Sequence, residues 1–465
     1  MTDSPLRGLV GSLNVVELPY VPPAATTSRS ELRARVLLFV VWLVMFAQGL
    51  VYVTRYALVN PYVDEWAFMP VLFGERPVGP WLWELHNEHR FPLPRLIYVG
   101  LFRLSGDLRA GCLVSFLGIS FMTGGLIRLA QSVRRRSHPA DAAFPLLLMH
   151  TGQGENLYMG YQMAFMLTTA LAGALLAVIV TTSSNHFRRG LQATVLGWLL
   201  LTCGAAGMVY AIASAAWVVV LVAFGRLALR QRIILGLFVP ITSIYVFAYF
   251  HGYVRPSHHP PSAGVLESAR IGLEAQAMAF GPAASGLWPY VGILIFLVGI
   301  VVVVETAYRA FGRGFDPRFG GLFLYVGAAA AVAFGIGWGR SGFNDNMGFA
   351  WRYGWITLPF VMATYFTWLL WGGRVATYGT TALALVALAF APVNIVSAFL
   401  NGEEKIRFVE AALEADVRAG KSAEEVVDTH FMDYRGSAQR EVIEAMRLMR
   451  DHRYAYYESL GREQP

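Results

Sequence analysis

The feature that most restricts the fold of this chain is a series of apolar runs, many of them near 20 residues long, across its first 400 residues. A run of that length, as an α-helix, matches the roughly 30 Å hydrocarbon core of a bilayer. Charge is scarce in the same stretch, which holds 16 acidic and 27 basic residues, whereas the 65 residues from Asn401 onward hold 14 and 10. We therefore expect an all-α polytopic membrane protein. A soluble enzyme, a disulfide scaffold, a coiled coil and a disordered chain are excluded.

The apolar runs predict about 11 transmembrane helices. The first, residues 36–56, is expected to be retained, because a cleavable signal peptide would place its apolar region nearer the start. The others are expected near residues 110–130, 141–151, 163–182, 190–203, 206–224, 233–250, 288–307, 319–338, 355–371 and 376–399. The chain then divides into a cytoplasmic N-terminal segment (1–35), a transmembrane domain (36–400) and a helical tail (401–465).

Arginine clusters set the expected orientation, since cytoplasmic loops carry an excess of Lys and Arg. They fall before the first span and then in every second loop: Arg29, Arg33, Arg35; Arg134, Arg135, Arg136; Arg188, Arg189; Arg226, Arg230, Arg232; Arg309, Arg313, Arg318; and Arg374. This places the N-terminus in the cytoplasm and, with an odd number of spans, the tail outside. The basic surplus is thereby explained without a nucleic-acid partner, and none is expected.

The first outer loop, residues 58–109, differs from an ordinary loop. It contains several tryptophans and prolines, and its apolar stretch 91–104 is interrupted by Arg95 and Arg103. That pattern favours interfacial helices lying along the outer surface. The tail has helical apolar spacing and a capping-box pattern at Ser422 and Glu425. It is expected to pack onto the outer loops, with a partner-binding helix as the alternative.

Two adjacent carboxylates, Asp64 and Glu65, follow directly on the first span. Neighbouring side chains diverge on a helix or strand, so the two are expected to do different jobs. One could act as a general base on a hydroxyl, and the other could bind a metal or orient its neighbour. The structural alternatives are a solvated pair or an N-cap of the following helix.

A second polar cluster comprises His86, Glu88, His89 and Arg90. On a helix, His86, His89 and Arg90 would share one face. The cluster is interpreted as a hydrogen-bonding group that fixes the loop near Asp64 or contacts an anion. A zinc site lacks an evident third ligand, and a merely solvated turn is the remaining alternative.

Two later outer loops supply the other candidate binding residues. Glu155, Asn156 and Gln162 offer the hydrogen bonds that sugars accept and donate, although a glycine-rich interhelical turn would also contain such residues. Near the other loop, Arg340 and Arg352 could neutralise a phosphate at the outer headgroup level. Contact with ordinary lipid headgroups explains the two arginines as well.

Taken together, these loops resemble the GT-C superfamily of polytopic membrane glycosyltransferases. The resemblance rests on Asp64-Glu65 in a long first outer loop, followed by an interfacial segment, and covers the architecture of about residues 36–400. The stretch from His86 to Arg90 and the pair Arg352-Tyr353 also look like those of bacterial membrane proteins placed near this superfamily. The Trp-Trp-Asp motif of the oligosaccharyltransferases is absent.

The resemblance implies an enzyme of cell-envelope polysaccharide biosynthesis in a bacterial inner (plasma) membrane. It would transfer a sugar from a polyprenyl-phosphate-linked donor to a hydroxyl of a glycan or lipid acceptor on the outer side. Asp64 in the first place, and Glu65 in the second, would be the catalytic base or a metal ligand. Because members of the superfamily differ in metal use, the resemblance leaves open whether a divalent cation (Mg²⁺ or Mn²⁺) is required. Donor, acceptor and membrane lipids are the expected partners. The alternative is a non-catalytic lipid-linked saccharide transporter or polysaccharide-assembly component. The residues expected to bind substrate are His86, Glu88, His89, Arg90, Glu155, Asn156, Gln162, Arg340, Arg352 and Tyr353.

Overall fold

The computed structural model describes residues 29–461, apart from 182–184, 257–258, 313–315 and 433–435. Within these residues the protein is all-α and has no β-strand; an isolated bridge pairs His86 with His89. Most of the predicted N-terminal segment, residues 1–28, lies outside the described part, as do Arg313 and residues 462–465 of the tail.

Twenty α-helices are described. They are α1 (Arg29–Tyr56), α2 (Met69–Leu72), α3 (Val78–Trp83), α4 (Pro92–Ser105), α5 (Arg109–Arg134), α6 (Ala143–Leu148), α7 (Glu155–Tyr158), α8 (Met163–Val180), α9 (His186–Leu201), α10 (Ala205–Phe224), α11 (Leu229–Gly236), α12 (Phe238–Phe250), α13 (Val265–Ala277), α14 (Tyr290–Phe311), α15 (Pro317–Arg340), α16 (Tyr353–Trp371), α17 (Gly373–Asn401), α18 (Phe408–Arg418), α19 (Ala423–His430) and α20 (Ser437–Asp451). The 3₁₀ turns are η1 (Val63–Phe68), η2 (Pro139–Ala142), η3 (Thr151–Gln153), η4 (Gly160–Gln162), η5 (Met278–Phe280), η6 (Pro282–Leu287), η7 (Met347–Phe349) and η9 (Ala455–Ser459), and a π-helical turn, η8 (Gly402–Arg407), joins α17 to α18.

Eight helical segments in the described residues are long and apolar enough to cross a membrane. They are α1, α5, α8 with η4, α10, α11 with α12, α14, α15 and α17 continued by α18. The other predicted spans correspond to α6, α9 and α16. Helix α6 has six residues and α9 has 16, which is short for a span, and α16 carries tyrosine, tryptophan and threonine side chains among its apolar residues. All three pack within the bundle against the longer helices.

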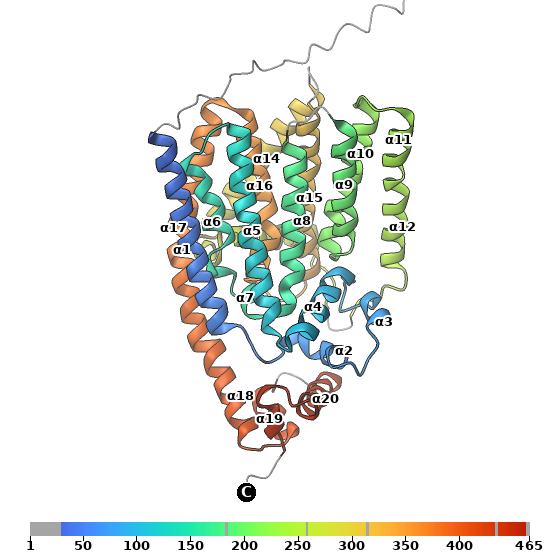
Figure 1. The fold of residues 1–465 in the computed structure, drawn as a ribbon, viewed down its shortest axis with the longest axis vertical. Helices are drawn as coiled ribbons and strands as arrows, with labels where there is room; N and C mark the ends of the chain where they lie inside the picture. Colours follow the sequence, from blue (N-terminus) through green and yellow to red (C-terminus); the bar gives the residue numbers. More distant parts are fainter. Residues whose placement is uncertain (1–28, 182–184, 257–258, 313–315, 433–435, 462–465) are drawn as a thin grey trace, which may run out of the picture.

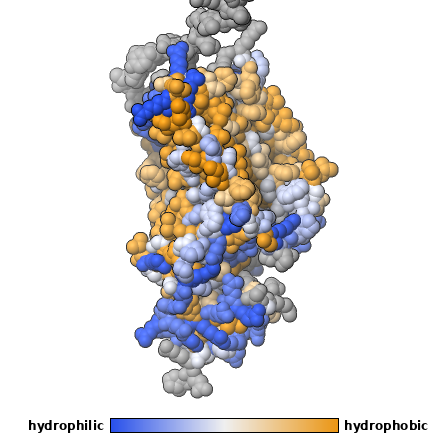
Figure 2. Space-filling view, turned by 90° about the vertical axis from the view of Figure 1, so that its right-hand side faces the viewer, coloured by the Kyte–Doolittle hydropathy of each residue, from blue (hydrophilic) through white to orange (hydrophobic). Residues whose placement is uncertain are grey.

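The bundle has two different ends (Figure 1). The N-terminal end of α1 and the turns that join α10 to α11 and α16 to α17 lie at the upper end, where the chain carries its arginine clusters. The short helices α2 to α4 and the tail helices lie at the lower end. Figure 2 shows an apolar band between polar surfaces at the two ends, as expected for helices that face lipid.

The tail packs onto the first loop. Side chains of α18, α19, α20 and η9 form one apolar cluster with residues of η1 and α2 to α4. Polar contacts fix the arrangement: Asn60 Nδ2 donates to Glu410 Oε2 at 2.5 Å, and the Tyr454 hydroxyl donates to the Val59 carbonyl at 3.0 Å. The Leu108 amide in turn donates to the Tyr454 hydroxyl at 3.3 Å. The tail therefore holds both ends of the first loop.

Helix α13 lies between the predicted spans 233–250 and 288–307. It packs closely against α14, α15 and α16. A Cβ at Gly337 of α15 would clash with the Ser268 carbonyl oxygen of α13, so glycine permits this close approach. The charged residues of α13 pair with one another along the helix, with Arg270 paired to Glu267 and, at 2.5 Å, to the buried Glu274. This pairing allows a charged helix to pack against the bundle.

Candidate functional site

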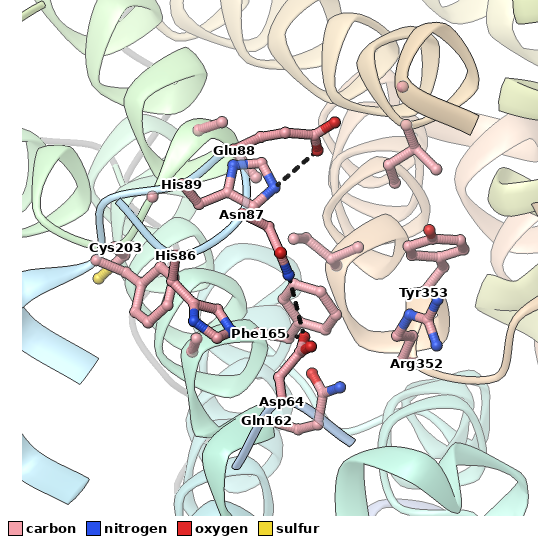
Figure 3. Close-up of a pocket in the computed structure, with 18 of the residues that line it drawn as sticks. Asp64, His86, Asn87, Glu88, His89, Gln162, Phe165, Cys203, Arg352 and Tyr353 are labelled. Atoms are coloured by element: carbon pink, nitrogen blue, oxygen red, sulfur yellow. Dashed lines mark hydrogen bonds and ion pairs between the residues drawn. The ribbon is translucent and has the colours of Figure 1, made fainter. Parts of the chain in front are cut away.

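A cavity of about 390 Å³ opens where the first loop meets the lower ends of α8, α10, α15 and α16. Nine of the residues predicted from the sequence line it: Asp64, His86, Glu88, His89, Glu155, Gln162, Arg340, Arg352 and Tyr353. They come from four separate stretches of the chain, and the fold brings them to one space. Figure 3 shows the Asp64 carboxylate and the Arg352–Tyr353 pair on opposite sides of that space.

The other wall of the cavity is apolar. It includes Phe165 of α8, Val209 of α10, Val332 of α15 and Ile356 of α16. These residues belong to membrane-crossing candidates or to helices packed between them. The cavity therefore lies at the boundary between the polar end and the apolar band, and it can hold a molecule with one polar and one apolar part.

The backbone at Val63 directs Asp64 toward the cavity. Val63 has φ +47°, a left-handed conformation that is unfavourable for a β-branched residue and costs about 1–3 kcal/mol. The following 3₁₀ turn, η1, then places Asp64 on the cavity side and Glu65 on the protein side. The adjacent carboxylates thus face different surroundings.

Glu65 does not line the cavity; it is buried at 1% exposure. Its Oε1 accepts hydrogen bonds from the Tyr98 hydroxyl and the Tyr161 amide, both at 2.8 Å, and its Oε2 accepts from the Tyr62 amide at 3.1 Å. Burial raises its pKa to about 7 although these donors oppose the shift. Glu65 thus ties η1 to α4 and η4, which positions Asp64 beside it.

Asp64 has polar neighbours of another kind. Its Oδ2 lies 3.6 Å from His86 Nε2 and 3.5 Å from Asn87 Nδ2. Partial burial alone would raise the pKa of Asp64, but the His86 and Asn87 contacts and the charge of Arg352 outweigh it and hold the pKa below its ordinary value. The carboxyl is therefore ionised at neutral pH, while its side chain is still 42% exposed to the cavity.

Residues 86–89 form a tight hairpin turn, so the expectation that His86, His89 and Arg90 share a helix face is wrong. The amides of His86 and His89 each donate to the carbonyl of the other residue, at 2.9 and 3.0 Å. Asn87 adopts φ +50°, a conformation that asparagine tolerates better than most residues. The turn, rather than a helix, presents His86 and Asn87 to Asp64.

Arg90 anchors this turn from behind and does not line the cavity. The buried guanidinium donates to the Tyr249 carbonyl at 3.0 Å and the His251 carbonyl at 2.9 Å, and also to the carbonyl of Trp83. Because all three acceptors are backbone carbonyls of neighbouring segments, Arg90 links the first loop to the end of α12. Its place in the structure is that of a positioning residue.

Glu88 faces the opposite side of the turn from Asp64. It is paired with His259, a residue that the sequence pattern did not single out, and its Oε2 lies 3.9 Å from His89 Nε2. Burial would raise the pKa of Glu88, but the histidines and Arg340 outweigh burial and lower it. No local signal marks His259, because its partner is 171 residues away in the chain.

The two arginines across the cavity differ in their partners. Arg352 Nη1 pairs with Glu155 Oε2 at 3.1 Å, whereas Arg340 Nε donates to the Tyr353 hydroxyl at 3.1 Å. Among the described residues, no carboxylate lies within ion-pair distance of Arg340. Arg340 thus retains a charge that is available to an anion, and Arg352 already shares its charge with Glu155.

The remaining predicted residues support this wall. Asn156 is fully buried, and its Nδ2 donates to the Arg352 carbonyl at 3.1 Å, so it fixes the backbone at Arg352 without lining the cavity. Gln162 lines the cavity beside Asp64 in Figure 3. Tyr62, Asn87 and Tyr161 also line it, although the sequence pattern did not assign them to the site.

A divalent cation was left open by the resemblance, with Asp64 and Glu65 as its ligands. Glu65 points into the protein, where its oxygens accept three hydrogen bonds. The described residues contain no group of three His, Cys, Asp or Glu side chains arranged to hold a metal ion. The donor set therefore does not fit a cation held by the two carboxylates.

Comparison with known proteins adds no family to this description. The chain matches no protein-family model and no curated protein sequence.

Proposed function

We propose that the protein is a GT-C-type membrane glycosyltransferase that moves a sugar from a polyprenyl-phosphate-linked donor to a hydroxyl of a glycan or lipid acceptor. The observation that carries the proposal is one cavity with an ionised carboxylate, two arginines on the other side and an apolar wall. A lipid-linked sugar transfer involves the matching groups: a hydroxyl that loses a proton, a phosphate that leaves, and an apolar chain.

In the proposed reaction the acceptor oxygen attacks the anomeric carbon of the donor sugar. The new bond from carbon to acceptor oxygen forms as the bond from that carbon to the phosphate oxygen breaks. Asp64 takes the acceptor proton, which requires it to be ionised and within about 3 Å of the hydroxyl. Its ionised state and its exposure to the cavity support that role.

The electron pair of the broken bond leaves on the lipid phosphate. Arg340 and Arg352 would stabilise the charge that develops there, because hydrogen bonds from a guanidinium to phosphate are strong and directional. Arg340 would carry the larger share, since Glu155 already pairs with Arg352. The lipid chain would lie along the apolar wall formed by α8, α10, α15 and α16.

The proposal includes the topology of 11 crossings, made by the eight candidate spans with α9, α16 and the segment that contains α6. The start of α1 and the tail lie at opposite ends of the bundle in Figure 1, and opposite ends require an odd number of crossings. The arginine-rich end would face the cytoplasm under the positive-inside rule. The cavity and the tail would then face the outer side of a bacterial plasma membrane.

The test is product analysis by mass spectrometry, with the purified protein, a panel of polyprenyl-phosphate sugars and candidate glycan or lipid acceptors. The proposal expects a product heavier than the acceptor by one sugar residue, together with free polyprenyl phosphate. Asp107→Asn is the matched control, because Asp107 lies in the same loop, pairs with Arg109 and does not line the cavity. Donor binding without transfer across the whole panel would instead favour a transporter or assembly component.

A further inference from the structure

A second polar cavity, of about 280 Å³, lies at the arginine-rich end of the bundle, away from the site containing Asp64. It is far larger than the roughly 15 Å³ that one water molecule needs. The first turns of α1 and the last turns of α5, with the residues that follow α5, form its lining. That lining contains Glu31, Arg35, Arg128, Gln131, Ser132, Arg135, Arg136 and Ser137.

The charge of this lining is strongly positive. Four arginines and one glutamate give a net charge of +3, and the glutamate, Glu31, is paired with Arg35 at 2.6 Å. Arg128, Arg135 and Arg136 have no ion-pair partner in the part of the chain that the structure describes. Arg134, by contrast, turns inward to the buried Asp141 at 2.6 Å, so it is not part of this cluster.

The helix spacing explains why the arginines meet. Arg128, Gln131 and Ser132 lie three and four positions apart on α5 and therefore share one face. Arg135 ends the helix with φ +63°, and Arg35 of α1 reaches across to donate to Ser137 Oγ at 3.3 Å. Hydrogen-bond donors from two helices and a turn thus converge on one space.

The surface next to this cavity is apolar and shallow. Gly124 and Gly125 lie one turn before Arg128 on α5, they are exposed, and a Cβ at either position would touch nothing. Phe121, one turn further along the helix toward the apolar band, is 87% exposed. An anion with a hydrocarbon chain can therefore place its charge among the arginines and its chain over the two glycines.

We propose that this cavity binds the phosphate headgroup of an anionic phospholipid of the surrounding leaflet. The arginines would provide charge-assisted hydrogen bonds to the phosphodiester, and basic pockets between membrane helices are suited to such headgroups. The adjacent apolar surface favours a lipid over a soluble phosphate. The site is separate from the cavity with Asp64, so the proposal stands whether or not the protein transfers sugars.

The test is a thermal-unfolding titration of the purified protein in a neutral detergent with short-chain phosphatidylglycerol. Phosphatidylcholine of the same chain length and soluble glycerol 3-phosphate are the comparison probes. The triple variant Arg128→Gln/Arg135→Gln/Arg136→Gln is compared with Arg226→Gln/Arg230→Gln/Arg232→Gln. The control removes the same charge at the same end of the bundle, outside the cavity lining.

We expect phosphatidylglycerol to raise the apparent melting temperature of the wild type and the control by a few degrees. The triple variant should bind it at least about 10-fold more weakly, and phosphatidylcholine should have little effect. Equal stabilisation by glycerol 3-phosphate would show a soluble-anion site. Equal stabilisation by phosphatidylcholine, or equal weakening in both triple variants, would also overturn the proposal.

Discussion

The pairing of Arg352 with Glu155 leads to a prediction that separates a phosphate-binding role from ordinary anchoring. Under the proposed function, removal of Arg352 would delete one charge-assisted contact to the donor phosphate, worth about 1.5–3 kcal/mol, or roughly 10- to 150-fold in kcat/KM. It also leaves the Glu155 carboxylate without its partner, which now lies at 3.1 Å. That unpaired carboxylate would then repel the phosphate.

The size of the repulsion follows from the geometry. A phosphate bound on the side of the guanidinium away from Glu155 would lie about 7 Å from that carboxylate, and Coulomb's law at an effective dielectric constant near 20 gives about 2 kcal/mol. The value of kcat/KM for Arg352→Ala should therefore fall roughly 30-fold further than loss of the phosphate contact alone would cause. The double variant Arg352→Ala/Glu155→Gln should recover that part of the loss and no more.

The assay is the initial rate of sugar transfer as a function of donor concentration. Arg103→Ala is the control, because Arg103 is an exposed arginine of the same end and does not line the cavity. Thermal unfolding of each variant confirms that it is folded. Failure of Glu155→Gln to restore activity to Arg352→Ala would refute the repulsion by an unpaired Glu155. An Arg352→Ala variant that behaves like Arg103→Ala would refute the phosphate-binding role of Arg352.

Three further predictions concern the elements that hold Asp64. Because the pKa of buried Glu65 is about 7 and its ordinary value is 4.5, the folded protein holds this proton more tightly than the unfolded chain. The Glu65 contribution to stability is therefore complete below pH 4.5 and is lost, by up to about 3 kcal/mol, as the pH rises to 7. Thermal unfolding of Glu65→Gln as a function of pH should lack this loss. Identical pH profiles for the wild type and the variant would contradict the prediction. Val63→Gly should raise the free energy of unfolding by about 1 kcal/mol by removing the left-handed strain, whereas an unchanged or lower stability would show that Val63 is unstrained. Tyr454→Phe should weaken the contact between the tail and the first loop by about 1–2 kcal/mol, which would appear as faster hydrogen exchange in residues 58–109. The control is Tyr378→Phe, because Tyr378 is exposed on α17. Equal exchange in the two variants would contradict the role of the tail in holding the first loop.

The bundle could be predicted from the sequence because long apolar runs have few alternatives in a bilayer. The exceptions have physical reasons. Helix α13 lies between two predicted spans and carries Glu267, Arg270 and Glu274, yet Arg270 pairs with both carboxylates and glycines allow close packing. Helix α6 has only six residues and depends on its neighbours for burial. Such elements are stabilised by tertiary contacts that no local pattern records.

The candidate site shows the same division. The polar loop residues could be identified individually, because carboxylates, histidines and arginines beside a membrane need a partner or a use. Their separate roles depend on distant contacts: Glu65 is a buried anchor because Tyr98 and Tyr161 reach it, and Arg90 is an anchor because the end of α12 lies behind it. His259 joins through Glu88 from far along the chain. A linear sequence does not contain those distances.

The most direct test of the account is the chemical step in Asp64→Asn. With donor prebound and acceptor added rapidly, a single-turnover measurement follows the transfer itself, and the substitution keeps the shape of the side chain while removing its ability to take a proton. We predict that the rate falls by about 10²- to 10⁴-fold while donor affinity and thermal stability stay near wild type, and that Asp107→Asn transfers normally. A folded, donor-binding Asp64→Asn protein that transfers sugar at the wild-type rate would contradict the catalytic role of Asp64.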